Sequence, residues 1–373
     1  MRLPLPAASK PEYEPLVMDD VRGAEARNGM VVASLFAGAG GSSTGYRLAG
    51  YEVAYANDCD PHAAATYSAN YPTTTFDPRP VEQVSVEDVL RACGGRPPDV
   101  LDGSPPCQSF STAGRRRVDD PRGTLFGEYA RLLGELRPRA FVAENVPGMA
   151  AGKMRGIFIE TCGMLRSAGY KLRVGMLDAQ WLGVPQRRRR LVFVGLRDDV
   201  PGTPSLPEPL RWRWGVSDVL PWIGRVVDMT TSFSSSHDGS GLSAANVAPT
   251  ITKTVNQLVA VEDEAWLRGK VLDGWRGLRE GEQHDRYFNL VRPLRDEPSP
   301  TILKFAGING SIAAVTYPVE PRKFSIAELR RIQSFPDDFE MDGSYAERWA
   351  RIGNSVPPLM MYHVAHRLAG VLG

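Results

Sequence analysis

The chain has 373 residues, of which 42% are hydrophobic and 23% are charged, so it is long enough to bury a sizeable core. Its 44 basic and 43 acidic residues leave a net charge of +1, which excludes a strongly basic coat protein for nucleic acid and a strongly acidic tail protein. A local basic groove is not excluded, because the steering of a ligand depends on where charges lie as well as on their sum.

The cysteine and histidine content argues against two classes of site. The four cysteines form neither a disulfide framework nor the paired spacing of a zinc site, and with only five histidines we expect no metal. The sequence contains no signal peptide and no apolar run of about 18 residues, so we expect a soluble cytoplasmic protein without a membrane segment.

The first half of the chain alternates between two kinds of pattern. Residues 1–29 are rich in proline and charge without periodicity, and we expect them to form a loosely packed arm. The expected strands are residues 31–36, 52–57, 99–101, 140–142 and 191–196, and the expected helices are residues 61–70, 123–136 and 155–168. Strands that alternate with helices predict a mostly parallel sheet covered on both faces, which is a doubly wound α/β domain.

The character of the sequence changes after residue 200. Residues 201–209 are rich in proline and read as a linker, and five of the seven tryptophans lie between residues 212 and 275. We therefore expect a smaller, irregular domain at residues 201–339. Residues 30–200 and 340–373 would together form the larger domain.

A glycine-rich segment, residues 36–41 (Phe-Ala-Gly-Ala-Gly-Gly), lies between an expected strand and an expected helix. Glycines there allow the backbone to approach a ligand, and the carboxyl ends of strands are where such folds bind cofactors. Asp58 ends the next strand, where an acid commonly takes ribose hydroxyls. Together these features favour a nucleoside-type cofactor over the alternative, which is a tight structural turn.

Residues 103–111 (Gly-Ser-Pro-Pro-Cys-Gln-Ser-Phe-Ser) follow another expected strand, which puts Cys107 at the carboxyl edge of the sheet in a turn stiffened by proline. A cysteine in a polar loop near cations can have a lowered pKa and act as a nucleophile. The alternative is a buried, inert cysteine, but the polar neighbours of Cys107 make a poor core strand. Cys59, Cys93 and Cys162 lack such a setting, and we interpret them as packing residues.

Two further segments reach the same edge. Glu144 ends another strand, where its carboxyl could donate or accept a proton; the alternative is a solvated loop acid. Residues 187–190 are four arginines that lead into the next strand, and strand alternation predicts that Arg188 and Arg190 point to one side of it. The alternative of a solvated basic run is weaker at the start of a buried strand.

Five segments occur in the order and spacing of the DNA cytosine-5 methyltransferase family, which the chain resembles. They are residues 36–41, Pro105-Pro106-Cys107-Gln108, Glu144-Asn145-Val146, Gln186-x-Arg188-x-Arg190 and Gly353-Asn354-Ser355-Val356. Residues 120–126 and 322–339 are also similar to that family. The resemblance covers residues 31–197 and 292–373, while residues 198–291 correspond only to the family's variable, target-reading insert.

The resemblance implies a Rossmann-like catalytic domain that binds S-adenosylmethionine, and a smaller irregular, β-rich target-recognition domain with its hinge at residues 201–339. It implies transfer of a methyl group to C5 of a cytosine flipped out of duplex DNA. Cys107 would add to C6 of the base, and Glu144 would hydrogen-bond N3 to stabilise charge on the ring. Arg190 and Arg188 would help to hold the base. Amino-group methyltransferases have an aromatic residue where Cys107 stands, which favours C5 chemistry here.

The residues that the resemblance assigns to the cofactor are Phe36, Ala37, Gly38, Gly40, Gly41, Asp58, Cys59, Pro105, Asn354 and Ser355. Two positions depart from the family pattern. Cys59 replaces the bulky apolar residue that stacks on adenine, and Pro80 falls where an acid contacts the adenine amino group. Asp77 is a substitute for that acid. A modified S-adenosylmethionine is the alternative cofactor.

Four residues are expected to contact DNA: Gln108, Arg115, Arg116 and Arg117. The resemblance implies a monomeric bacterial enzyme with double-stranded DNA as its partner, located in the cytoplasm and at the nucleoid when on DNA. A cognate restriction endonuclease acting separately is a candidate partner. The alternatives are a transfer RNA cytosine-5 methyltransferase and a catalytically inactive DNA-binding regulator.

Overall fold

The computed structural model describes residues 9–106, 125–223, 261–287, 290–304 and 315–373. Cys107, Gln108 and the arginines at 115–117 lie outside the described residues. No described helix is long and apolar enough to cross a membrane. Among the same residues, no group of His, Cys, Asp or Glu side chains is arranged to hold a metal ion.

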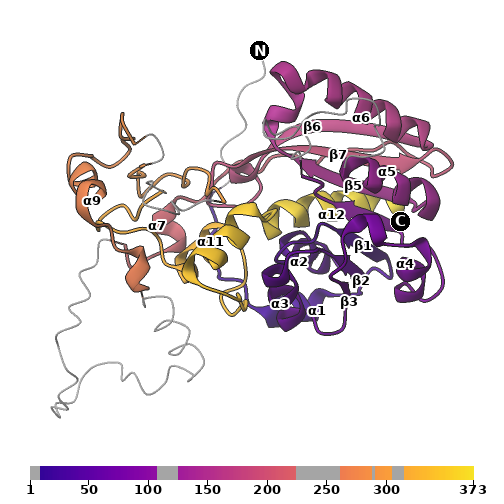
Figure 1. The fold of residues 1–373 in the computed structure, drawn as a ribbon, viewed down its shortest axis with the longest axis horizontal. Coiled ribbons are helices and arrows are strands. Elements are labelled where there is room, and N and C mark those ends of the chain that lie inside the picture. Colours follow the sequence, from indigo (N-terminus) through magenta and orange to yellow (C-terminus); the bar gives the residue numbers. More distant parts are fainter. Residues whose placement is uncertain (1–8, 107–124, 224–260, 288–289, 305–314) are drawn as a thin grey trace, which may run out of the picture.

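A seven-stranded sheet forms the centre of the molecule (Figure 1). Its strands are β1 Val31–Leu35, β2 Glu52–Asn57, β3 Thr75–Asp77, β4 Val100–Gly103, β5 Ala140–Asn145, β6 Tyr170–Asp178 and β7 Arg189–Arg197. They lie in the order β3-β2-β1-β4-β5-β7-β6. The first five strands of this order pair in parallel, whereas β7 runs antiparallel to both β5 and β6. The predicted doubly wound, mostly parallel α/β fold is confirmed.

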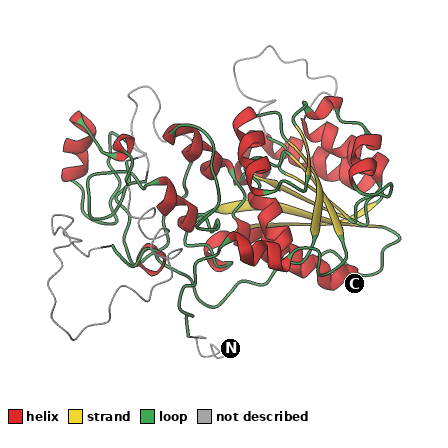
Figure 2. Ribbon diagram, turned by 90° about the horizontal axis from the view of Figure 1, so that it is seen from below, coloured by secondary structure: helices red, strands yellow, loops and turns green. Residues whose placement is uncertain are grey.

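Helices cover both faces of this sheet (Figure 2). The described helices are α1 Met18–Ala24, α2 Gly41–Leu48, α3 Pro61–Asn70, α4 Val86–Ala92, α5 Leu125–Leu136, α6 Arg155–Ser167, α7 Val216–Val219, α9 Gly269–Arg276, α10 Ile326–Ile332, α11 Tyr345–Asn354 and α12 Pro358–Leu372. On one face α2 and α12 pack on Val32, Val142 and Val194, and on the other α4, α5 and α6 pack on Leu101 and Phe141. Because the central strands are buried on both faces, they read as continuous apolar runs in the sequence.

The N-terminal arm contains a helix that the sequence did not predict. Met18 and Val21 of α1 are buried against Ala56 and Phe335. The Met18 N–H donates to the carboxylate of Asp338 at 2.8 Å, which ties the arm to the C-terminal part of the chain. Residues 18–24 are therefore packed rather than loose, because seven residues are enough to bury one apolar side of a helix.

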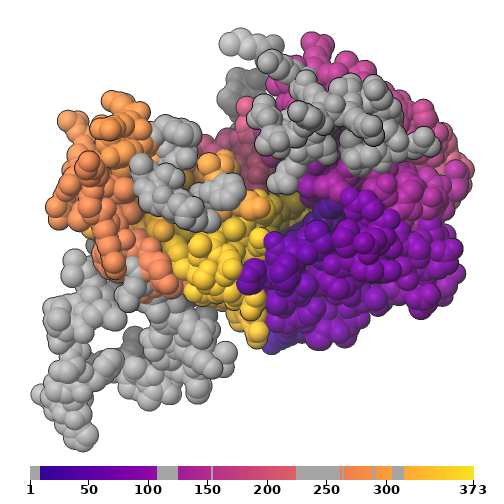
Figure 3. All heavy atoms as spheres, viewed as in Figure 1, coloured from indigo at the N-terminus to yellow at the C-terminus, as the bar shows by residue number. Residues whose placement is uncertain are grey.

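The described residues between 261 and 304 form a lobe, seen in orange in Figure 3, whereas residues 201–209 pack against the larger domain through Leu206. The lobe contains short helices and isolated β-bridges. Val216, Ile302 and Phe324 share one buried cluster with Trp349 and Ile352 of α11. The lobe and α11 thus have a common core, which extends across the predicted domain boundary at residue 339; that boundary stays a prediction.

Candidate active site

Five chain segments meet at one edge of the sheet. The parallel strands β1, β2, β4 and β5 all end there, which brings together the glycine-rich loop, Asp58, residues 104–106 and Glu144. Because β7 is antiparallel to β5, its first residues lie at the same edge, and Leu191 pairs with Asn145. The edge therefore also receives Arg190, although β7 runs in the opposite direction.

The glycine-rich loop after β1 has a backbone that glycine permits. Gly38 and Gly40 have φ angles of 54° and 90°, in the left-handed region that other residues rarely adopt. At Gly41 a Cβ atom would lie 2.2 Å from the carbonyl oxygen of Val356, so the C-terminal segment packs directly on this loop. The loop is thus bounded by the segment that contains Asn354 and Ser355, and only at Gly38 would an added Cβ atom meet nothing within 4 Å, whereas at Gly40 it would meet Tyr71.

Asp58 follows β2 and contacts the glycine-rich loop. One of its carboxylate oxygens accepts the Gly38 N–H at 2.8 Å, and the other accepts the Asp60 N–H at 3.0 Å. Burial raises the pKa of Asp58 above its ordinary value. The acid predicted at this position is therefore next to the cofactor loop and holds its backbone.

Glu144 and Arg190 form an ion pair at the end of β5. The Arg190 Nε lies 2.6 Å from the Glu144 Oε1, and the two side chains are 12% and 10% exposed. Burial raises the pKa of Glu144, against the opposing effects of Arg190, Arg188 and a hydrogen bond from Ser104. The pair stands at the edge of the sheet where β4 ends, so a carboxyl and a cation converge at the end of the described segment 104–106.

Arg188 has different partners from Arg190. Its guanidinium is buried and donates to the carbonyl oxygens of Ile302, Gly353 and Ser355 at 3.1, 2.9 and 2.9 Å. Burial, together with the charge of Arg190, lowers the pKa of Arg188 to about 9. That Arg188 helps to hold a base stays a prediction: its two terminal nitrogens donate to backbone carbonyls, while its buried Nε has no hydrogen-bond partner among the described residues.

Gln186 adds further hydrogen bonds between the same segments that Arg188 joins. Its side-chain oxygen accepts the Ile302 N–H at 3.0 Å, and its amide group donates to Gln333. Gln333 in turn donates to the Ser355 carbonyl at 2.8 Å. The lobe, the start of β7 and the C-terminal segment are therefore joined by one buried set of amides and a guanidinium.

Asn145 connects β5 to the segment that follows β4. Its side-chain amide donates to the Pro105 carbonyl at 3.0 Å. This contact ties the end of β5 to residue 105 of the neighbouring segment. Pro105 itself is buried, and the chain continues from there toward Cys107.

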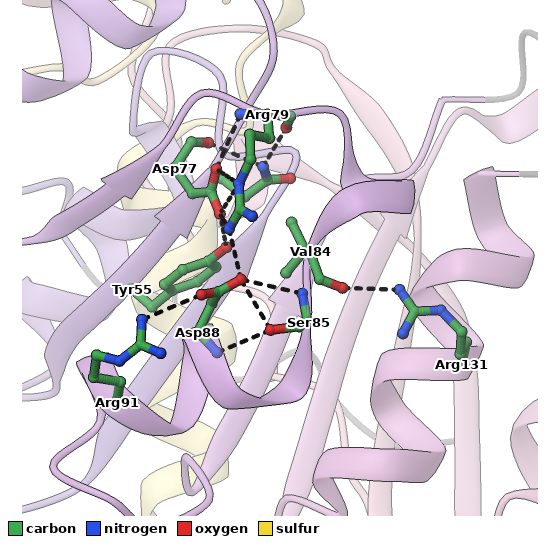
Figure 4. A network of polar contacts seen from close by, with 9 residues as sticks. Tyr55, Asp77, Arg79, Val84, Ser85, Asp88, Arg91 and Arg131 are labelled. Carbon is green, nitrogen blue, oxygen red and sulfur yellow. Dashed lines mark hydrogen bonds and ion pairs between the residues drawn. The ribbon is translucent and has the colours of Figure 1, made fainter.

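The structure also places Cys59 and Asp77, which the sequence relates to the adenine side of the cofactor site. Cys59 is exposed, so the prediction that it is a packing residue is wrong, whereas Cys93 and Cys162 are buried, as packing residues would be. Asp77, the predicted substitute acid, accepts hydrogen bonds from Tyr55 at 2.8 Å and from Arg79 at 2.6 Å (Figure 4).

Arg79 also pairs with Asp88 at 2.6 Å. The hydrogen bonds from Arg79 hold the pKa of Asp77 below its ordinary value against the opposing effect of burial. Both oxygens of Asp77 are engaged in this network, so its carboxylate is poorly placed to serve as a free acceptor for an adenine amino group.

Three comparisons with known proteins agree with this geometry. The family model of the C-5 cytosine-specific DNA methylases matches residues 30–370. The Type II methyltransferase M.XorII of Xanthomonas oryzae pv. oryzae is 32% identical, over 91% of this chain and 84% of the relative. M1.HphI of Haemophilus parahaemolyticus is 31% identical, over 89% of this chain and 84% of the relative. A solved structure assigned as a prophage-encoded DNA modification methyltransferase (E. coli) matches with a TM-score of 0.71 and 26% identity, over 92% of this chain and 99% of the other.

Proposed function

The chain belongs to the C-5 cytosine-specific DNA methylase family and is a DNA cytosine-5 methyltransferase. We propose that it acts on a cytosine flipped out of duplex DNA, and that the reaction passes through a covalent bond between Cys107 and C6 of that cytosine. The observation that carries this proposal is the Glu144–Arg190 pair, because it stands at the strand edge where the chain continues to Cys107. Flipping is required because the target atom otherwise lies inside the base stack.

The residues divide the work on the base. The Cys107 thiolate adds to C6, and the electron pair of the C5–C6 bond becomes available at C5. Glu144 is the donor to N3: burial raises its pKa and favours the protonated carboxyl, which donates a hydrogen bond to N3 and stabilises the charge that develops on the ring. Arg190 holds Glu144 in place. Once C5 has taken the methyl group, loss of the C5 proton to water restores the C5–C6 double bond as the Cys107 thiolate leaves.

S-adenosylmethionine supplies the methyl group when it is bound. The glycine-rich loop, with space beside Gly38 and with Asp58 holding its backbone, fits a nucleoside-type cofactor. Asn354 and Ser355 would bound it on the C-terminal side, since the Val356 carbonyl packs on Gly41.

We assign Arg188 a positioning role in this scheme. Its guanidinium holds the carbonyls of Gly353 and Ser355 on either side of Asn354. It also holds Ile302 of the lobe. A change at Arg188 would therefore reach both the cofactor segment and the proposed target-recognition region.

The enzyme's setting follows from its relatives. The names of M.XorII and M1.HphI describe Type II methyltransferases, which supports a role in a restriction-modification system. We propose that the protein works as a cytoplasmic monomer that associates with the nucleoid on DNA. A separate restriction endonuclease would be its functional partner.

The activity is tested by incubating the protein with labelled S-adenosylmethionine and duplex DNA, followed by digestion to nucleosides. We expect labelled 5-methylcytosine with the native protein, none with Cys107→Ser, and wild-type yield with Cys162→Ala, which removes a buried cysteine of α6. Product on transfer RNA in place of DNA would show an RNA enzyme. No product on either substrate, or undiminished product from Cys107→Ser, would overturn the mechanism.

A further inference from the structure

A second buried carboxylate lies at the same sheet edge and has no part in the mechanism above. Asp102 is in β4, five residues before Cys107, and is 1% exposed. In the parallel register it stands beside Ser34 of β1 and Val142 of β5. A carboxylate without a cation is costly to bury, so its contacts need an explanation.

One oxygen of Asp102 accepts two hydroxyls. Its Oδ2 lies 2.9 Å from the Ser34 Oγ and 2.7 Å from the Ser42 Oγ. Ser34 lies in β1 before the glycine-rich loop, and Ser42 lies in the first turn of α2 directly after it. The two serines therefore mark the two ends of the loop, and a single oxygen holds both.

We propose that Asp102 is a positioning residue that clamps both ends of the cofactor loop to the strand that leads to the nucleophile. This inference rests on the proposed cofactor site. A loop fixed at both ends gives up less conformational freedom when a ligand binds, so the clamp increases affinity without touching the ligand. It also joins the loop and the Cys107 segment to one side chain.

The charges around the clamp come from three elements. The other oxygen of Asp102, Oδ1, is buried and has no hydrogen-bond partner among the described residues. Tyr46 of α2, Tyr129 of α5 and Glu144 of β5 all interact electrostatically with Asp102, and the Tyr46 hydroxyl, like those of Ser34 and Ser42, favours its charged form. Burial raises the pKa of Asp102 to about 6. Burial thus disfavours the charge of Asp102, and the two hydroxyls that its Oδ2 accepts give this carboxyl a structural role.

The test measures binding of S-adenosylhomocysteine by calorimetry and hydrogen exchange of the amides of residues 37–43 without any ligand. Asp102→Ala removes the shared acceptor, and we expect the Kd to rise about tenfold and exchange to accelerate at the loop alone. Asp102→Asn keeps an acceptor oxygen and is expected to stay within about threefold of the native Kd. Ser34→Ala added to Asp102→Ala should cost nothing further, because the two changes remove the same bond.

Ser43→Ala is the matched control, because Ser43 is also buried in α2 but bonds to Tyr67 instead. We expect Ser43→Ala to leave the Kd and the loop exchange unchanged. If Asp102→Ala does not fold, Ser34→Ala/Ser42→Ala is measured in its place and is expected to show the same loss. An unchanged Kd and unchanged loop exchange in the folded variant, or equal effects of Ser42→Ala and Ser43→Ala, would overturn the clamp. Failure of the native protein to bind S-adenosylhomocysteine would instead count against the proposed function, while loop exchange would still report on the clamp.

Discussion

The ends of β4 and β5 each hold a buried carboxylate, but the two groups are compensated in different ways. Glu144 at the end of β5 pairs with a guanidinium and remains 8% exposed. Asp102 in β4 is 1% exposed and has two hydroxyls as partners. The difference supports the proposal that Glu144, which has a cation as its partner, contacts the substrate, whereas the more deeply buried Asp102 holds two serine hydroxyls.

The largest expected effect concerns the carboxylate of Glu144. Glu144→Gln keeps the size of the side chain but weakens the contact that stabilises charge on the base, so we expect methyl transfer to fall by about a hundred- to thousandfold. Single-turnover rates with labelled cofactor measure this fall. If Glu144→Gln retained more than a tenth of the native rate, the contact of Glu144 with the base would not be the main source of stabilisation. The proposed difference in role between Glu144 and Asp102 would then be wrong.

The carboxylate of Asp102 should show itself in the pH dependence of stability. Because the pKa of Asp102 is about 6 in the folded protein against an ordinary 3.8, the folded state binds more protons than the unfolded state between these values. Its contribution to stability is therefore full below pH 4 and is lost as pH rises through 6, a difference of about 3 kcal/mol.

Urea unfolding of the native protein and of Asp102→Asn, at pH 4, 5, 6 and 7, isolates this contribution. The native protein should lose stability relative to the variant as pH rises. A constant difference between the two proteins across this range would show that Asp102 titrates as an ordinary carboxyl.

Arg188 extends the comparison to a buried cation. Arg188→Met removes three hydrogen bonds to buried carbonyls, and we expect a loss of about 2 to 3 kcal/mol in the free energy of unfolding. Arg189→Met is the control, because Arg189 is exposed and should change stability by less than about 0.5 kcal/mol. Equal midpoints of urea unfolding for the two variants would contradict the role of Arg188 in joining these buried carbonyls.

The smallest effect is expected at the end of β3. Arg79 pairs with Asp77 and Asp88 but is 44% exposed, so solvent screens the pairs. Arg79→Met should therefore lower the midpoint of urea unfolding by less than Arg188→Met does. A larger loss would mean that an exposed cation compensates a carboxylate here as strongly as Arg190 does at β5.

Much of the sheet could be predicted from apolar runs. The expected strands at 31–36, 52–57 and 140–142 correspond to β1, β2 and β5, and the helix at 61–70 is α3. The edge strand β6 was missed, since a strand at the margin of a sheet is only partly buried and its charged residues interrupt the apolar run.

The site was predicted in part for the same reason. Glu144 could be placed at the carboxyl edge, because it directly follows a buried strand. Asp102 could not be singled out, because nothing in the local sequence distinguishes an aspartate that accepts two distant serine hydroxyls. Cys107 lies outside the described residues, so its place next to Glu144 remains a prediction.

The sequence by itself determined the family, the order of the motifs and the alternation that separates Arg188 and Arg190 from their neighbours, because these are properties of adjacent residues. Only the tertiary structure decided that the antiparallel direction of β7 brings Arg190 to Glu144, and that Arg188 bonds to Gly353 and Ser355. Hydrogen-bond partners depend on which distant segments pack together, and side-chain alternation along one strand carries no information about them.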